Sequence, residues 1–296
     1  MSKIALCQVL PKAGEPNINF SVMNKIIKNY SKKGVKLCVF PEDYLYGILR
    51  DRFKLVDAGK KFHYWTHKFT LLAKYYHIDL IPGTFPRYYQ QNIYNTTVYI
   101  NHQGKILNKY AKNNLWLSER AEYRPGTETP QCFESVLGKT AIIICWDIFD
   151  HRLFESAVKQ DAQWVIVLSF WSINQSEDNA QERGRVTNTY PDLNDSNIID
   201  SLIQSRVAEY NLGIIFCNFA KFFIYPGNTG KKQIAISANR TQIVCPFNKV
   251  QKRITNRKET ILLYDVPSII QYIKDFEICY GRREDIVQSY PYLTPE

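Results

Sequence analysis

The stretch Thr140-Ala-Ile-Ile-Ile-Cys145-Trp146-Asp147 decides how the fold of this chain is interpreted. Its β-branched apolar residues predict a buried strand, and a polar, turn-prone segment and then a helical pattern follow it. Cys145 therefore stands at the carboxyl end of a core strand, where open α/β sheets present reactive groups. Taken alone, such a cysteine is more often a small core residue than a nucleophile.

Two other segments change this interpretation, because each places a charged side chain at the end of a predicted strand. In Phe40-Pro41-Glu42 the proline ends the strand and the carboxylate follows at once, and a second strand-like run ends in Lys112. Alone, either charge would be ordinary solvated surface. A thiol, a carboxylate and an ammonium presented together suit acyl transfer, because the carboxylate can take the thiol proton and the cation can stabilise an oxyanion.

These motifs, in their order and spacing, resemble those of the nitrilase superfamily of carbon–nitrogen hydrolases over nearly the whole chain. The motifs are Phe40-Pro41-Glu42, Tyr94-Asn95-Thr96, Tyr110-Ala-Lys112-Asn-Asn-Leu115 and Cys145-Trp146-Asp147. Glu119, six residues before Pro125, matches the second active-site glutamate of many members. The sequence departs from the family pattern after Asp147, where the Phe-Pro-Glu helix start of many members is absent.

The resemblance implies a role for each of five residues. Glu42 is expected to act as general base and acid, and Cys145 as the nucleophile that forms a thioester acyl-enzyme. Lys112 and the backbone N–H of Trp146 are expected to hold the oxyanion, and Glu119 to orient the substrate or the lysine. A carboxylate beside a thiol raises both pKa values unless a cation balances them, so the lysine is also required electrostatically.

The chain alternates strand and helix patterns, which predicts an α/β layered fold. With 296 residues, 45% of them hydrophobic, and no composition break, we expect one domain over residues 1–296. We expect strands in residues 3–10, 35–40, 78–85, 164–170 and 213–219, and helices in residues 17–33, 62–76 and 199–210. The resemblance implies a four-layer α-β-β-α sandwich of two similar halves.

Residues 171–196 form a long polar stretch rich in Asn, Asp, Gln and Ser, with little periodicity. Loops of this length are either functional or disordered. Because this one starts at a strand end on the side of Cys145, we predict that it forms part of a substrate lid.

Charge and cysteine content bear on partners and location. The net charge of +10 can attract nucleic acid, anionic lipid or an acidic substrate, but no nucleic-acid motif accompanies it, so we expect ordinary solvated surface. The N-terminus enters a strand at once and no apolar run approaches the ~20 residues that span a bilayer, so we expect no signal peptide and no membrane span. Seven cysteines without a CxxC pair fit a reducing compartment, and the cytoplasm is the expected location.

One pattern resembles a metal site. His63 and His67 stand at i and i+4 on a predicted helix, the spacing that zinc peptidases use, but Tyr64 occupies the position of their glutamate and no third ligand is evident. A packed aromatic helix explains the segment better. No Gly-rich phosphate loop is present, and we expect neither a metal nor a cofactor.

Together with Glu42, Lys112 and Cys145, the resemblance implies a cofactor-free thiol hydrolase that cleaves a non-peptide C–N bond in a small amide or N-carbamoyl amine through an acyl-enzyme. The resemblance also suggests a homodimer or larger homo-oligomer. Two alternatives stay open: an acyltransferase that uses the same three residues, and a non-catalytic binding protein on the same fold. The acyl group and the leaving amine are not specified by the sequence.

Overall fold

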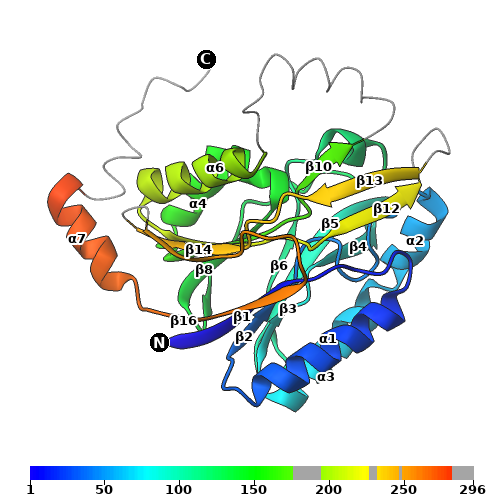
Figure 1. Cartoon of the computed structure of the whole chain (residues 1–296), viewed down its shortest axis with the longest axis horizontal. Helices are drawn as coiled ribbons and strands as arrows, with labels where there is room; N and C mark the ends of the chain where they lie inside the picture. The colour runs from blue at the N-terminus through cyan, green and yellow to red at the C-terminus, as the bar shows by residue number, and fades with distance from the viewer. Residues whose placement is uncertain (176–194, 227–231, 247–248, 282–296) are drawn as a thin grey trace.

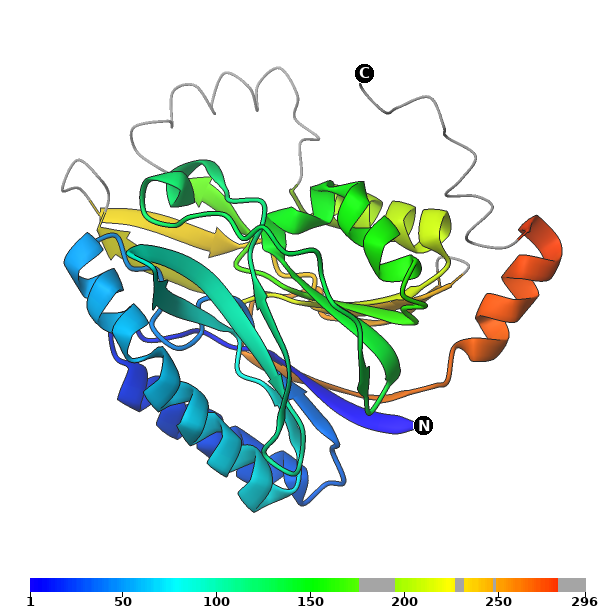
Figure 2. The same cartoon turned by 180° about the vertical axis from the view of Figure 1, so that it is seen from behind.

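The structure, a computed structural model, describes residues 1–175, 195–226, 232–246 and 249–281, and its helices and sheets lie in layers (Figure 1). Two large sheets pack face to face in the middle, and helices cover the outer face of each sheet (Figure 2). This arrangement confirms the predicted four-layer α-β-β-α sandwich.

The first sheet is built around three parallel strands joined by crossover helices. Its order is β16-β1-β2-β3-β5-β4, with β6 paired to β5. Its strands are β1 (Ser2–Gln8), β2 (Leu37–Val39), β3 (Asp79–Ile81), β4 (Thr84–Tyr89), β5 (Asn92–Ile100), β6 (Ile106–Ala111) and β16 (Thr260–Val266). Strands β1, β2 and β3 run parallel. The connections between them contain α1 (Pro16–Ser31), α2 (Arg52–Lys60) and α3 (Phe62–Tyr76).

The second sheet repeats this plan, with order β15-β14-β11-β9-β8-β7. Its strands are β7 (Phe133–Ser135), β8 (Gly138–Ile144), β9 (Trp164–Leu168), β11 (Gly213–Cys217), β14 (Gln242–Cys245) and β15 (Lys249–Arg253). Strands β8, β9 and β11 are parallel, and α4 (His151–Val158) and α6 (Asp195–Tyr210) lie on the connections between them. The two halves of the sandwich are therefore similar.

A smaller sheet and a last helix lie outside these four layers. The small sheet contains β10 (Ser172–Gln175), β12 (Phe222–Pro226) and β13 (Lys232–Ser237), in the order β10-β13-β12. Helix α7 (Ile270–Tyr280) follows β16 and extends away from the body of the molecule (Figures 1 and 2).

Apolar side chains fill each of the three spaces between the layers. Along β1, Ala5 and Cys7 pack towards the helices of the first half, whereas Ile4 and Leu6 pack against the second sheet. Because both faces of the central strands are buried, these strands are continuously apolar rather than alternating. The third space, between the second sheet and helices α4 and α6, holds residues such as Phe154.

The predicted elements are found, most with shorter bounds, and one of them is wrong. The helix predicted for residues 62–76 is α3, with the same limits. The single strand predicted for residues 78–85 is instead two strands, β3 and β4, separated at Pro82-Gly83. Proline offers no N–H to a strand ladder, and Gly83 has a φ of +84°, which a continuous strand does not contain.

Other expectations concern single features. His63 and His67 lie on the exposed face of α3, whose buried face packs aromatic side chains such as Trp65 and Phe69. The polar stretch 171–196 begins as strand β10 and ends inside α6, so its ends are more regular than predicted. The lid predicted there falls mainly on residues 176–194, which lie outside the described residues.

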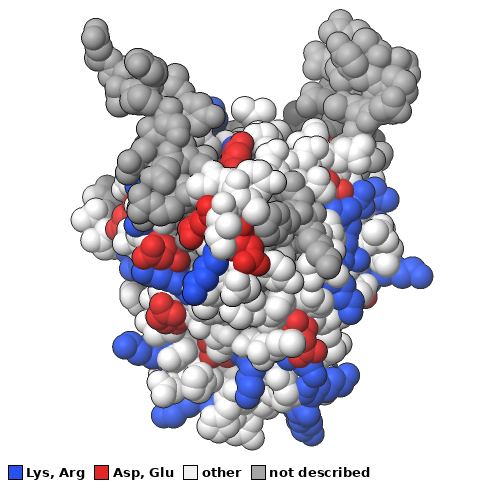
Figure 3. All heavy atoms as spheres, turned by 90° about the vertical axis from the view of Figure 1, so that its left-hand side faces the viewer, with Lys and Arg blue, Asp and Glu red and all other residues white. Residues whose placement is uncertain are grey.

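The surface carries charges of both signs. On the face shown in Figure 3, Lys and Arg side chains are dispersed among Asp and Glu side chains rather than gathered in one patch. No helix in the described ranges combines the length and the apolar character that a membrane crossing requires. All seven cysteines are free thiols, and Cys7, Cys38, Cys217 and Cys245 are buried in the core.

Candidate active site

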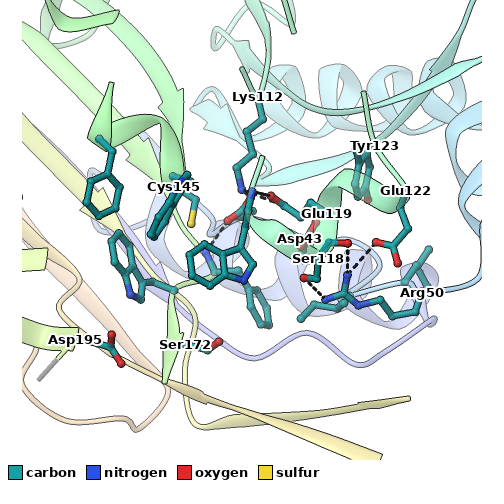
Figure 4. Close-up of a pocket in the computed structure, with 18 of the residues that line it drawn as sticks. Asp43, Arg50, Lys112, Ser118, Glu119, Glu122, Tyr123, Cys145, Ser172 and Asp195 are labelled. Atoms are coloured by element: carbon teal, nitrogen blue, oxygen red, sulfur yellow. Dashed lines mark hydrogen bonds and ion pairs between the residues drawn. The ribbon is translucent and has the colours of Figure 1, made fainter. Parts of the chain in front are cut away.

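Three strand ends bring the predicted residues to one pocket. Glu42 follows β2, Lys112 follows β6 directly, and Cys145 follows β8 directly. All three line a cavity of about 180 Å³ (Figure 4). The first two come from one large sheet and the third from the other, so the packing of the two halves assembles the site.

A buried ion network occupies one side of this pocket. Lys112 Nζ lies 2.8 Å from Oε1 of Glu42 and 2.7 Å from Oε2 of Glu119. The side chains of Lys112 and Glu42 are 1% and 2% exposed, so neither charge is solvated by bulk water. The lysine therefore depends on the two carboxylates, and they depend on it.

Glu42 is fixed by two further donors. The side-chain amide of Asn95, on β5, donates to Oε1 at 2.9 Å, and the backbone N–H of Phe170 donates to Oε2 at 2.8 Å. Phe170 follows β9 of the second sheet, so this carboxylate is held from both halves of the molecule. Neither donor was predicted, although Asn95 lies within the Tyr94-Asn95-Thr96 motif of the sequence.

Glu119 is presented by a short 3-10 helix, η1 (Leu117–Ala121), in the loop after Lys112. Its Oε2 accepts the backbone N–H of Trp116 at 2.7 Å, which holds the side chain towards the lysine. The structure thus places Glu119 beside Lys112.

Cys145 follows β8 at a sharp turn and is the first residue of a second 3-10 helix, η2 (Cys145–Phe149). Its φ of +49° is uncommon for a residue other than glycine and marks local backbone strain. The hydroxyl of Ser169 lies 3.5 Å from the thiol sulfur and donates to it. The turn points the thiol into the pocket, beside Lys112 (Figure 4).

Trp146 follows the thiol and contributes to an aromatic wall. Its ring lies 4.3 Å from the ring of Trp116 and 4.2 Å from that of Phe149, between centroids. Trp171, at the start of the 171–196 stretch, completes this wall at 5.5 Å from Trp146. Ser172 and Asp195, near the two ends of that stretch, also line the pocket.

Asp147, the last residue of the Cys145-Trp146-Asp147 motif, connects the lysine loop to the thiol turn. Its Oδ1 accepts the backbone N–H groups of Asn113 at 3.1 Å and Asn114 at 2.7 Å. Its Oδ2 accepts the backbone N–H of Ile144 at 3.0 Å and the hydroxyl of Tyr110 at 2.9 Å. Asp147 is fully buried, so these bonds set the position of both loops.

Burial dominates the electrostatics of the three central groups. It raises the pKa of Cys145 well above its ordinary value, and the Glu42 charge raises it further, against the attraction of Lys112. Burial also raises the pKa of Glu42, which Lys112 partly offsets. Burial alone would lower the pKa of Lys112, but the carboxylates of Glu119 and Glu42 hold that pKa well above its ordinary value.

These three pKa shifts indicate a protonated thiol, a carboxylate able to accept a proton, and a permanent cation in one site. Such a site can move a proton from sulfur to carboxylate while the sulfur attacks a carbonyl carbon. No group of three or more His, Cys, Asp or Glu side chains within the described ranges is arranged to hold a metal ion.

Comparison with known proteins gives a consistent result. A family model described as carbon-nitrogen hydrolase matches residues 3–274. A probable nitrilase of Schizosaccharomyces pombe is 23% identical over 275 residues, which cover 90% of this chain and 88% of that protein. An (R)-stereoselective amidase of a Pseudomonas species is 29% identical over 168 residues, covering 56% of this chain and 59% of that protein.

Two solved structures share the fold. Saccharomyces cerevisiae Nit3, a member of branch 10 of the nitrilase superfamily, superimposes with a TM-score of 0.73 at 19% identity and covers 94% of each chain. A mutant amidase from Nesterenkonia sp. AN1 has a TM-score of 0.72 at 17% identity, covering 98% of this chain and 96% of its own. In that amidase the acetamide moiety of fluoroacetamide is covalently added at the active-site cysteine.

Proposed function

This chain belongs to the carbon-nitrogen hydrolase family, and from that premise we propose that it hydrolyses the C–N bond of a small amide or N-carbamoyl amine through a covalent acyl-enzyme. Cys145 is the nucleophile, Glu42 the general base and acid, and Lys112 the fixed cation. The observation that carries the proposal is the convergence of these three side chains in one buried pocket, with Lys112 Nζ 2.8 Å from Glu42.

In the acylation step, Glu42 accepts the proton of the Cys145 thiol while the sulfur attacks the substrate carbonyl carbon. The negative charge that develops on the carbonyl oxygen is stabilised by Lys112 Nζ and by the backbone N–H of Trp146. Glu42 then gives its proton to the leaving nitrogen, the C–N bond breaks, and ammonia or an amine departs. Because the thiol is protonated in the resting site, the base is needed for the attack.

In the deacylation step, Glu42 takes a proton from a water molecule, whose oxygen attacks the thioester carbon. The same two donors stabilise the second oxyanion, and the C–S bond breaks to return the thiol and release the acid. An N-carbamoyl substrate would give ammonia, carbon dioxide and an amine. Covalent addition at the active-site cysteine of the Nesterenkonia amidase supports the same covalent chemistry here.

The pocket favours a small substrate. Its volume of about 180 Å³ is close to that of the ~150 Å³ cavity that holds benzene in an engineered protein. Glu119 lies 2.7 Å from Lys112 Nζ at the edge of this space, and the aromatic wall described above offers an apolar surface for the rest of a substrate. We place the reaction in the cytoplasm, because seven free thiols suit a reducing compartment.

The decisive experiment measures ammonia release from a panel of small amides, N-carbamoyl amines, N-carbamoyl amino acids and nitriles. Wild type and Cys145→Ala are compared, with Cys279→Ala as the matched control because that thiol is exposed on α7. We expect release that disappears in Cys145→Ala and persists in Cys279→Ala. Folded wild-type protein that releases ammonia from no member of the panel would refute the proposal and favour an acyltransferase or a binding protein.

A further inference from the structure

The pocket has a second polar end, remote from the thiol. There Arg50 Nη1 lies 2.9 Å from Oε2 of Glu122, and Arg50 Nη2 donates to the hydroxyl of Ser118 at 2.9 Å. Figure 4 shows Cys145 and Lys112 on one side of Glu119, and Arg50 with Glu122 on the other. A substrate that reacts at Cys145 can therefore extend along the pocket towards this end.

The pocket is acidic although the whole chain is basic. Among the described residues that line it, five are carboxylic acids and two are cations. The acids are Glu42, Asp43, Glu119, Glu122 and Asp195. Both cations are already engaged, Lys112 with Glu42 and Glu119, and Arg50 with Glu122. Among the described lining residues a substrate carboxylate would find no cation that is not already paired with a carboxylate, whereas a substrate cation would find more carboxylates than cations.

Asp43 is a lining carboxylate whose side chain has no hydrogen bond or ion pair to another described residue. Its backbone is held, since its N–H donates to the Thr84 hydroxyl at 2.9 Å and its carbonyl accepts the Gly47 N–H at 2.7 Å. Burial, and then the charges of Glu42 and Glu119, raise the pKa of Asp43 well above its ordinary value, and the charges of Lys112 and Arg50 offset this only in part.

The position of Asp43 suits contact with a bound molecule. It follows Glu42 directly in the sequence, and Figure 4 shows it between Glu119 and Ser118, on the way to Arg50. The rings of Trp116 and Tyr123 line the same cavity. A cation near such rings also gains cation–π attraction.

We propose that this pocket selects amides whose remote end carries an ammonium group, and that Asp43 is the residue that binds this group. The inference rests on the proposed function for the scissile end and adds the chemical class of the substrate. An ω-amino amide would place its amide at Cys145 and its ammonium at Asp43, and hydrolysis would release ammonia and an ω-amino acid.

An alternative explanation for an aspartate at position 43 is the backbone conformation of the turn. Its φ is +54°, and Asp is one of the few residues that adopts this left-handed region readily. Asn adopts the region as readily as Asp, and Gly more readily still. Replacement by Asn therefore keeps the turn and removes only the charge, which separates the two explanations.

Binding is measured by calorimetry in a Cys145→Ala background, so that no turnover is needed. The ligands are 5-aminopentanamide, the uncharged hexanamide and the anionic adipamate, which have the same amide and chains of similar length, together with shorter members of each series. We expect the Kd of the ammonium ligand to be lower than that of hexanamide by about tenfold or more, the effect of one hydrogen bond between charged groups. Adipamate should bind most weakly of the three.

Adding Asp43→Asn should reduce the preference for the ammonium ligand to about twofold or less. Asp43→Gly is a second variant compatible with the turn, in case the first folds poorly. Asp57→Asn is the matched control, because Asp57 is 66% exposed on α2 and pairs with Lys61 outside this pocket, and it should keep the full preference.

Equal binding of charged and uncharged ligands, no binding of any of them, or a preference that survives Asp43→Asn would overturn the inference. These results are independent of the proposed function, which fails instead if wild type hydrolyses no amide. Hydrolysis of amides without preference for the ammonium series would leave the proposed reaction standing and refute the role of Asp43.

Discussion

One carboxylate oxygen of Asp147 accepts the backbone N–H of Asn114 at 2.7 Å, although the two residues are 33 positions apart. Asn114 follows the lysine at the end of the first sheet, and Asp147 follows the thiol at the end of the second. The other oxygen accepts the N–H of Ile144, immediately before Cys145. A single side chain thus sets the distance between the cation and the nucleophile.

Replacement of Asp147 by Asn should impair both stability and turnover. The new amide group turns one side of the carboxylate from acceptor to donor, so buried N–H groups lose partners at about 1–3 kcal/mol each. We expect a lower melting temperature and kcat/KM reduced by about tenfold or more, measured by calorimetry and ammonia release. Asp161→Asn is the control, because that side chain is 74% exposed, and it should leave the melting temperature and kcat/KM equal to those of wild type. An Asp147→Asn protein with wild-type stability would contradict this account.

The difference in the free energy of unfolding between wild type and Asp147→Asn should also depend on pH. Burial raises the pKa of Asp147 to about 6, above its ordinary 3.8, so the folded protein binds this proton more tightly than the unfolded chain does. The contribution of Asp147 to the free energy of unfolding should therefore fall as pH rises through this interval. Urea unfolding of wild type and Asp147→Asn at several pH values measures this contribution. A stability difference between the two proteins that increased with pH would contradict the prediction.

Removal of the buried cation should be costly. Lys112→Met leaves the carboxylates of Glu42 and Glu119 facing each other without compensation, and breaking a buried pair in this way costs about 3–5 kcal/mol. Loss of the oxyanion donor should also reduce kcat by about 10²–10³. Adding Glu119→Gln removes one of the two stranded charges, so the double variant should be more stable than Lys112→Met alone while remaining inactive.

The double variant is the informative comparison. Two results would contradict the account. Lys112→Met could have the same free energy of unfolding in urea as wild type, or the double variant could be no more stable than Lys112→Met. Either result would show that the two carboxylates do not depend on the lysine.

The acid limb of the rate profile should report Glu42. Burial raises the pKa of Glu42 above its ordinary 4.5, and only the ionised carboxylate can accept the thiol proton. We expect kcat/KM to rise with pH through an apparent pKa above 4.5, a value that belongs to the coupled set of Glu42, Lys112 and Cys145. Rates for a neutral amide between pH 4 and 9 measure it. A profile that stays flat down to the ordinary pKa of a glutamate would remove Glu42 from the role of base.

Gly83 should be essential for the position of Glu42. A side chain at Gly83 would overlap the carbonyl oxygen of Pro41, the residue before Glu42, and its φ of +84° strains any other residue. Gly83→Ala should lose about 1–3 kcal/mol by overpacking and lose activity as well. Gly34→Ala is the control, because its φ is +75° but nothing lies within 4 Å of the added atom. Similar losses in both variants would show that strain alone, and not the contact with Pro41, explains the effect.

The sequence predicted what depends on neighbours along the chain, and it missed what depends on neighbours in space. A polar residue directly after an apolar run placed Glu42, Lys112 and Cys145 at strand ends, and the order and spacing of their motifs made the three a candidate site. The backbone N–H of Phe170, which binds Glu42, has no sequence signature because any residue supplies it.

Asp147 and Asp43 illustrate the same limit. Asp147 ends the thiol motif and Asp43 follows the glutamate motif. Only the fold shows that Asp147 accepts bonds from two loops, and that Asp43 lines the pocket with no side-chain hydrogen bond to another described residue. The break at Pro82-Gly83, in contrast, was readable from the two residues themselves, since proline and glycine are the strongest local signals for a turn.

Strand β16 pairs with β1 along its whole length, with Ser2 opposite Val266. During synthesis, β1 therefore lacks its outer neighbour until residues 260–266 have been made. Until then the first sheet has an open apolar edge, which is the kind of surface on which partly made chains associate with one another. A chain that stops before residue 260 would keep Glu42, Lys112 and Cys145 and still carry that edge, so we expect it to aggregate during expression, although it keeps every residue of the proposed chemistry.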